Sequence, residues 1–157
     1  MYTLKLIIYD FDGVMTDNKI YVDQDGREMV QVNRSDGLAV SEIKKLGIEQ
    51  IIISTEVNPV VSARANKIGI PCLQGINNKK DTLIDYCQKY NIDLKNVTYV
   101  GNDINDIDAI KIVGYSFCPA DAHGSIKKIS NLILNTKGGN GVIRELFDLL
   151  KGELKNE

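Results

Sequence analysis

Short runs of hydrophobic residues alternate along the chain with stretches in which hydrophobic side chains recur every three or four positions. The short runs predict buried strands, at residues 4–9, 49–54, 97–100, 115–118 and 132–134. The periodic stretches predict helices, at residues 38–46, 59–68, 80–90, 105–112, 125–130 and 142–150. Because strands and helices alternate, the pattern predicts an α/β fold, a parallel sheet flanked by helices on both faces.

One segment departs from this alternation. Residues 19–22 and 28–32 read as two short strands, and the turn-forming sequence of residues 23–26 separates them. The segment therefore predicts a β-hairpin over about residues 19–33. Ser35 or Asp36 is expected to cap the helix that follows.

Composition narrows the function classes. The 157 residues suit one domain, residues 1–157, and 43% hydrophobic with 25% charged residues is typical of a globular protein. A net charge of −2 gives no global attraction to nucleic acid or to an anionic membrane. Three widely spaced cysteines indicate neither a disulfide framework nor a zinc site. With no signal-like or membrane-spanning stretch, we expect a cytoplasmic protein.

An acidic pair follows the first predicted strand. Asp10 and Asp12 are separated by one residue, and Gly13 allows a close turn. Two neighbouring carboxylates repel unless a cation lies between them, and Mg²⁺ prefers such oxygen ligands. With a phosphoryl substrate, one carboxylate can attack phosphorus while the other protonates the leaving group and then activates water.

Further polar groups follow the next strands. Ser54 and Thr55 end the second strand and can hold a phosphate oxygen, and Lys79 or Lys80 opens a helix and can neutralise the transferring group. Residues 101–106 end the third strand with a second acidic cluster suited to a metal site. Each feature alone is weak evidence for a functional site. All of them, however, follow strands or open helices, and the ligand sites of open α/β sheets lie at the carboxyl ends of the strands.

Together these motifs resemble the haloacid dehalogenase superfamily of phosphotransferases, whose first motif, DxDGxxT, is matched in full by residues 10–16. The resemblance implies a Rossmann-like core and covers essentially the whole chain. It implies that Asp10 is the nucleophile, that Asp12 is the general acid and base, and that Ser54 and Lys79 are the second and third motifs. Spacing to residues 74–75 favours Lys79 over Lys80.

The resemblance also implies a Mg²⁺ ion held by the Asp10 side chain, the Asp12 backbone carbonyl and the fourth motif. This chain has Asn102 where the family usually has an acid. Either Asn102 or Asp103 would then bind the metal. Asp106 would orient the lysine or a metal-bound water, and it completes the set of candidate metal residues.

The chain leaves no room for the cap domain that many members of this superfamily carry. It resembles instead the capless sugar-acid phosphatases, through residues 33–37 after the hairpin and the glycine-rich residues 138–145. Members of that group are tetramers in which a neighbour completes each site. Because an isolated hairpin is marginal in water, we expect hairpins of several subunits to pair, in a homotetramer.

Within this group, the segment after Ser54 favours one sugar acid phosphate over another as the substrate. Glu56, Arg64 and Lys67 resemble residues that mark the nonulosonate 9-phosphate phosphatases, which points to a 2-keto-3-deoxy sugar acid phosphate and to sialic-acid-type metabolism. Arg64 and Lys67 lie three residues apart on one predicted helix, so both can bind the substrate carboxylate. Glu56 can accept hydrogen bonds from sugar hydroxyls. Thr55, next to Glu56 in the sequence, is a further candidate for substrate binding. The alternative substrate is 3-deoxy-D-manno-octulosonate 8-phosphate.

Two readings from other classes compete with the phosphatase. A response-regulator receiver also uses acids, Mg²⁺ and a lysine, but its phosphate acceptor follows the third strand, and its first acids are normally adjacent. An inactive, oligomer-forming relative of the phosphatases is the second. Intact Asp10, Asp12, Ser54 and Lys79 argue against it, and Asn102 keeps it open.

Overall fold

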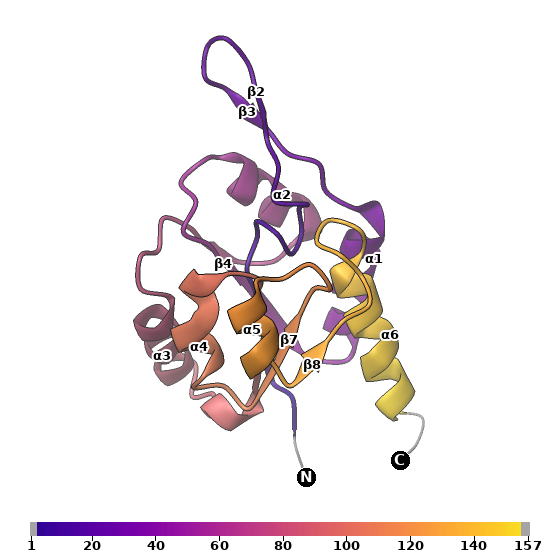
Figure 1. Ribbon diagram of the computed structural model, residues 1–157. Coiled ribbons are helices and arrows are strands. Elements are labelled where there is room, and N and C mark those ends of the chain that lie inside the picture. The colour runs from indigo at the N-terminus through magenta and orange to yellow at the C-terminus, as the bar shows by residue number, and fades with distance from the viewer. Residues whose placement is uncertain (1–2, 155–157) are drawn as a thin grey trace.

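The structure, a computed structural model, describes residues 3–154 and has a central sheet of six parallel strands (Figure 1). Their order across the sheet is β5-β4-β1-β6-β7-β8. The strands are β1 (Leu6–Tyr9), β4 (Glu49–Ile53), β5 (Cys72–Leu73), β6 (Val97–Val100), β7 (Tyr115–Cys118) and β8 (Leu132–Ile133). The first strand, β1, lies in the middle of the sheet, between β4 and β6. From β1 the chain adds β4 and β5 on one side of the sheet and then β6, β7 and β8 on the other. The loop after β1 therefore lies at the point where the strand order reverses, which is where open α/β sheets bind ligands.

Six helices and two short 3₁₀ turns connect the strands. The helices are α1 (Arg34–Lys45), α2 (Val60–Ile68), α3 (Lys79–Lys89), α4 (Ile107–Ile110), α5 (Gly124–Ile129) and α6 (Val142–Leu154). The 3₁₀ turns are η1 (Leu94–Asn96) and η2 (Ile104–Asp106). The predicted α/β fold with a parallel sheet flanked by helices is confirmed.

The alternation of side chains along β1 divides the core into two layers. Ile7 and Tyr9 point to the face covered by α1, α2 and α6, whereas Leu6 and Ile8 point to the face covered by α3, α4 and α5. All four side chains are fully buried, as expected for a central parallel strand with helices on both faces. This packing fixes the loop after β1 on a rigid support.

The boundaries differ from the sequence prediction at several points. Helix α1 begins earlier than expected, because Asn33, rather than Ser35 or Asp36, is its N-cap and accepts a hydrogen bond from the Ser35 backbone N–H. Strand β5 was not predicted, since only two residues pair with β4. Helix α6 also runs four residues past its expected end.

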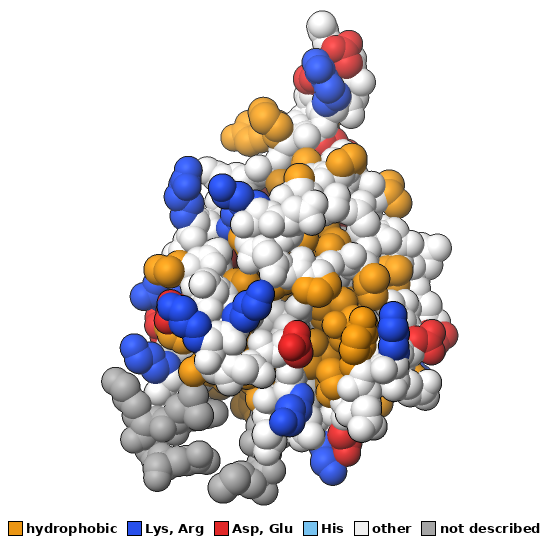
Figure 2. Space-filling model, turned by 180° about the vertical axis from the view of Figure 1, so that it is seen from behind, with side chains coloured by type: hydrophobic (Ala, Val, Ile, Leu, Met, Phe, Trp, Pro, Cys, Tyr) orange, Lys and Arg blue, Asp and Glu red, His pale blue; other side chains and the backbone are white. Residues whose placement is uncertain are grey.

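The hairpin projects from the body of the molecule, as Figure 1 shows. Its paired strands, β2 (Tyr21–Val22) and β3 (Glu28–Met29), are shorter than predicted, and a bridge between Thr16 and Val32 closes its base. Ion pairs from Arg27 to two aspartates hold the charged tip, which stands clear in Figure 2. Below the tip, hydrophobic side chains are exposed, namely Ile20, Tyr21, Val22 and Met29.

The glycine-rich loop before α6 packs directly on the loop after β1. The Gly139 N–H donates to the carbonyl oxygen of Val14 (3.1 Å), and a Cβ at Gly138 would collide with the carbonyl oxygen of Gly13. Only glycine allows two backbones to approach this closely. The C-terminal segment thereby supports the acidic loop that follows β1.

Asp36 joins α1 to the same C-terminal segment. Its Oδ1 accepts hydrogen bonds from the backbone N–H groups of Ile143 (3.0 Å) and Arg144 (3.1 Å), at the start of α6. The side chain is buried, and burial raises its pKa to about 6, although those two N–H groups and nearby Arg64 oppose the rise.

This raised pKa predicts a pH-dependent stability. Below about pH 4 the carboxyl is protonated in both the folded and the unfolded state. Between about pH 4 and 6 only the folded state keeps the proton, so the free energy of unfolding falls as pH rises through this window. An Asp36→Asn variant keeps the acceptor for both N–H groups and lacks the titration.

We therefore expect the wild type to lose about 2–3 kcal/mol relative to Asp36→Asn between pH 4 and pH 7. Urea unfolding of both proteins across this range measures the difference directly. A difference that stays constant with pH contradicts the assignment.

Within residues 3–154, no helix has both the length and the apolar character needed to span a bilayer. The three cysteines are free, two buried and one half-buried.

Candidate active site

A small cavity of about 140 Å³ opens at the carboxyl ends of β1, β4 and β6. It is lined by Asp10, Asp12, Asn18, Ser54, Thr55, Asn102, Asp103 and Asn105. Parallel strands bring their carboxyl ends to the same edge of the sheet, which explains how residues far apart in sequence meet here. Six of these eight side chains are among the residues predicted from the sequence; Asn18 and Asn105 are not.

Buried charges surround Asp10. Its Oδ1 accepts hydrogen bonds from the Phe11 backbone N–H (2.7 Å) and from Lys79 Nζ (2.9 Å). Lys79 Nζ also donates to Asp106 Oδ1 (2.7 Å), which accepts in addition from the Tyr99 hydroxyl (2.7 Å). Lys79 is 2% exposed and Asp106 is fully buried, so these charges can balance only one another.

The pKa values reflect that balance. Burial, and then the charge of Asp106, raise the pKa of Asp10 against the opposing effect of Lys79. Burial lowers the pKa of Lys79, but the two carboxylates outweigh it and raise this pKa overall. Lys79 is therefore a fixed cation, and a single positive charge faces two buried carboxylates. The site favours a further cation beside Asp10.

Asp12 lies at the opening of the cavity, half-buried. Its Oδ1 accepts a hydrogen bond from the Thr16 hydroxyl (3.2 Å). Burial raises the pKa of Asp12, and the nearby charge of Glu56 adds to the rise, while Thr16 lowers it. A carboxyl group with a raised pKa beside a more deeply buried carboxylate suits a proton donor and acceptor.

The residues at the cavity fit Mg²⁺. Asn102 Oδ1 is buried and accepts no hydrogen bond within the described part of the chain, so an acceptor faces the site unpaired. Asp10 and Asp103 line the same cavity and can supply carboxylate oxygens. No three His, Cys, Asp or Glu side chains converge as a metal cluster within residues 3–154. The donor set is therefore mixed, with one amide replacing an acid.

Asp106 does not belong to that donor set. Its Oδ1 is engaged by Lys79 and Tyr99, and its Oδ2 accepts from the backbone N–H of Asn102 (2.9 Å) and of Asp103 (3.3 Å). With both oxygens taken and the side chain fully buried, Asp106 orients Lys79 and the loop after β6 instead. This corrects its inclusion among the candidate metal ligands.

The two candidate lysines differ in burial, and so do the two candidate hydroxyl residues. Lys79 points into the site, whereas its neighbour Lys80 is exposed. Ser54 is buried at the end of β4, and its hydroxyl accepts from the Glu56 backbone N–H (3.1 Å). Thr55 is exposed and lines the cavity. The positions of Ser54, Thr55 and Lys79 thus agree with the prediction.

The other three predicted substrate residues lie outside the cavity wall. Glu56 Oε1 accepts from the backbone N–H groups of Val57 and Asn58, both at 2.8 Å. Arg64 Nη2 donates to the carbonyl oxygen of Asn33 (2.8 Å), and Lys67 is exposed on α2. Within one chain, Arg64 therefore supports the start of α1.

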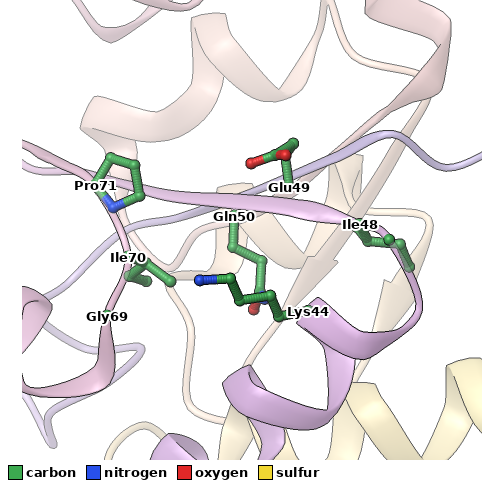
Figure 3. A pocket seen from close by; sticks show the side chains of 8 residues that line it. Lys44, Ile48, Glu49, Gln50, Gly69, Ile70 and Pro71 are labelled. Carbon is green, nitrogen blue, oxygen red and sulfur yellow. The ribbon is translucent and has the colours of Figure 1, made fainter.

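A second and larger hollow, of about 240 Å³, lies at the opposite end of the sheet. Figure 3 shows Lys44 reaching toward Ile70 across this hollow, beside Gln50. The Gln50 side chain is used internally, because it bonds with Tyr9 and with the Val40 carbonyl oxygen. The hollow holds no pair of carboxylates, so the smaller cavity is the one equipped for chemistry.

Comparison with known proteins agrees with this geometry. The family of haloacid dehalogenase-like hydrolases matches residues 66–146. The 3-deoxy-D-manno-octulosonate 8-phosphate phosphatase KdsC of Escherichia coli K12 is 35% identical over 148 residues, which cover 94% of this chain and 79% of that protein.

Solved structures extend the similarity. The 3-deoxy-D-manno-octulosonate 8-phosphate phosphatase of Moraxella catarrhalis, in complex with magnesium, phosphate and the sugar acid KDO, has a TM-score of 0.91 and 29% identity, covering 95% of this chain and 86% of that one. The cobalt-bound enzyme of Haemophilus influenzae has a TM-score of 0.91 and 28% identity, covering 96% and 89%.

Proposed function

The chain belongs to the haloacid dehalogenase-like hydrolases, and we propose that within this family it removes phosphate from a 2-keto-3-deoxy sugar acid, with 3-deoxy-D-manno-octulosonate 8-phosphate as the first candidate substrate. It is a phosphatase that uses Mg²⁺. The observation that carries the proposal is the buried system of Asp10, Lys79 and Asp106 beneath a cavity of phosphate size.

The proposed substrate differs from the one that the sequence analysis favours. Glu56, Arg64 and Lys67 favoured a nonulosonate 9-phosphate and sialic-acid-type metabolism. The named relatives act on the octulosonate, and they support this alternative better. Within one chain, Arg64 and Glu56 make their contacts with backbone groups rather than with the cavity.

In the proposed reaction, Asp10 attacks phosphorus. Its Oδ1 is held by Phe11 and Lys79, which leaves Oδ2 for the attack. The bond from phosphorus to the ester oxygen breaks, and Asp12 gives its proton to that oxygen. Asp12 then takes a proton from a water molecule that attacks the aspartyl phosphate, which releases phosphate and restores Asp10.

The remaining residues stabilise charge. Lys79, which contacts Asp10, can neutralise the phosphoryl oxygens, and Ser54, which lines the cavity, can hold one of them. Mg²⁺, when bound by Asp10, the Asp12 carbonyl and Asn102 or Asp103, supplies positive charge that lowers the pKa of Asp10 and offsets the phosphate.

A substrate panel tests the function. We expect Mg²⁺-dependent phosphate release, with kcat/KM highest for octulosonate 8-phosphate, intermediate for nonulosonate 9-phosphates and lowest for p-nitrophenyl phosphate. A preference for nonulosonates would keep the mechanism and move the substrate to the second candidate. Absence of release from every ester contradicts the proposed function and favours the inactive relative.

The second candidate, a nonulosonate 9-phosphate, is favoured by one observation. Glu56 follows the cavity residue Thr55, and its charge acts on Asp12.

For this candidate, Arg64→Ala raises KM for sugar acid phosphates about tenfold, as loss of a charged hydrogen bond predicts, with a smaller change for p-nitrophenyl phosphate. Equal losses on both esters would mean that Arg64 acts only by holding Asn33.

We also propose that the hairpins pair between copies of the chain, in a homotetramer. Tyr21 is 72% exposed and Met29 is 66% exposed on a two-stranded hairpin that a single chain leaves uncovered. The double variant Tyr21→Lys, Met29→Lys is expected to have the mass of a single chain by light scattering. An oligomer unchanged from the wild type contradicts the pairing.

A further inference from the structure

The size of the catalytic cavity limits what it can hold. At about 140 Å³ it is smaller than the roughly 300–1,000 Å³ typical of sites that enclose a whole ligand. It suits a phosphoryl group and a metal ion. The carbon chain of a sugar acid must then lie over the opening of the cavity, against the side chains that form its rim.

The exposure of the side chains that line the cavity increases from its floor to its rim. Asp10, Ser54 and Asn102 form the floor, and each is at most 8% exposed. Asn18, Thr55 and Asn105 line the same cavity and are exposed. All three rim side chains are uncharged and carry both hydrogen-bond donors and acceptors. These three neutral side chains do not themselves repel a phosphate or a carboxylate, and they can pair with hydroxyl groups whichever way those groups point.

The backbone at Asn18 is unusual. Its φ is +67°, a left-handed conformation that glycine adopts most easily. The Asn18 N–H donates to the Thr16 hydroxyl (3.1 Å), but its side-chain amide makes no hydrogen bond within residues 3–154. A free amide therefore stands at the cavity opening, at a position where the backbone alone would favour glycine.

Asn105 and Thr55 face each other across the opening. Asn105 comes from η2 and Thr55 from the loop after β4, and a hydrogen bond of 3.4 Å joins Nδ2 of the first to Oγ1 of the second. That distance is at the long end for such a bond, so a ligand hydroxyl can replace it at little cost. Both groups are then available to a substrate.

We propose that Asn18, Thr55 and Asn105 form a subsite that binds the hydroxyl groups on the carbons next to the phosphate ester. The proposal rests on the proposed function, in which the leaving group is a hydroxylated sugar acid. The rim selects polyhydroxylated phosphate esters over apolar ones, and it does so without contacting the reacting phosphorus.

Two esters that differ only in hydroxyl groups test this selection, glycerol 3-phosphate and n-propyl phosphate. The variants are Asn18→Gly, which suits the backbone at φ +67°, and Asn105→Ala. Asn91→Gly is the matched control, because Asn91 is also exposed with a positive φ of 54° but follows α3, at the other end of the sheet. The measured quantity is the ratio of kcat/KM for glycerol 3-phosphate to that for n-propyl phosphate.

We expect the wild type and Asn91→Gly to prefer glycerol 3-phosphate. Each rim variant is expected to lower the ratio about fivefold, the effect of one neutral hydrogen bond, and the double variant about 25-fold. If both rim variants keep the wild-type ratio, or if the wild type shows no preference, the subsite is refuted while the phosphatase function stands. No release from either ester or from octulosonate 8-phosphate would instead refute the proposed function, and the subsite with it.

Discussion

Replacing Asp10 with asparagine is expected to lower kcat by about 10⁴-fold or more, because the covalent step has no substitute. Asparagine has nearly the same shape, and its amide oxygen can accept the Phe11 and Lys79 hydrogen bonds that Asp10 Oδ1 accepts. It lacks the negative charge needed for attack on phosphorus. The variant also leaves Lys79 paired with Asp106, so we expect the fold to persist.

Rapid-quench measurements with a ³²P-labelled ester separate this role from others. The wild type should form a transient phosphoenzyme, and Asp10→Asn should form none. Asp17→Asn is the matched control, because Asp17 lies on the same loop with its carboxylate bonded to the Lys19 backbone N–H and outside the cavity wall. Normal turnover by Asp10→Asn, or loss of phosphoenzyme in the control, contradicts the assignment of Asp10 as nucleophile.

The sheet and its functional edge were predictable because their signals are local. Four fully buried residues of β1 followed directly by Asp10 indicate both a central strand and the loop that carries the proposed nucleophile. The same reasoning identified Ser54 after β4 and Asn102 after β6, since a parallel sheet brings these ends together. Burial of Lys79 rather than Lys80 agrees with a preference drawn from spacing.

Other features depend on long-range contacts that no local pattern carries. Asp106 looks like a metal ligand in sequence, and only the folded chain shows that Lys79 and Tyr99 meet at its Oδ1, while backbone N–H groups after β6 occupy its Oδ2. Asn18 and Asn105 resemble ordinary turn residues, because asparagine is common wherever chains turn. Their exposure at one cavity follows from the folding of two loops that are far apart in the sequence.

Replacing Lys79 with methionine is expected to destabilise the protein by about 3–5 kcal/mol and to lower kcat by at least about 10²-fold. The variant leaves Asp10 and Asp106 buried without their shared cation. The donors that remain, the Tyr99 hydroxyl and backbone N–H groups, are neutral and do not replace its charge. The removed charge also lies beside Asp10, where it can neutralise the transferring phosphoryl group of the proposed reaction. Urea unfolding and p-nitrophenyl phosphate turnover measure the two effects.

The adjacent residue supplies the matched control, since Lys80 is exposed and Lys80→Met removes the same charge from the surface. We expect that variant to stay within about 0.5 kcal/mol of the wild type. The stability deficit of Lys79→Met should shrink at pH 5 without metal, because burial raises the pKa of Asp10 and its protonation removes one of the two charges that lysine otherwise balances. If the deficit is the same at pH 5 and pH 8, Lys79 stabilises the fold by packing rather than by charge, and its place in the catalytic balance of Asp10 and Asp106 is wrong.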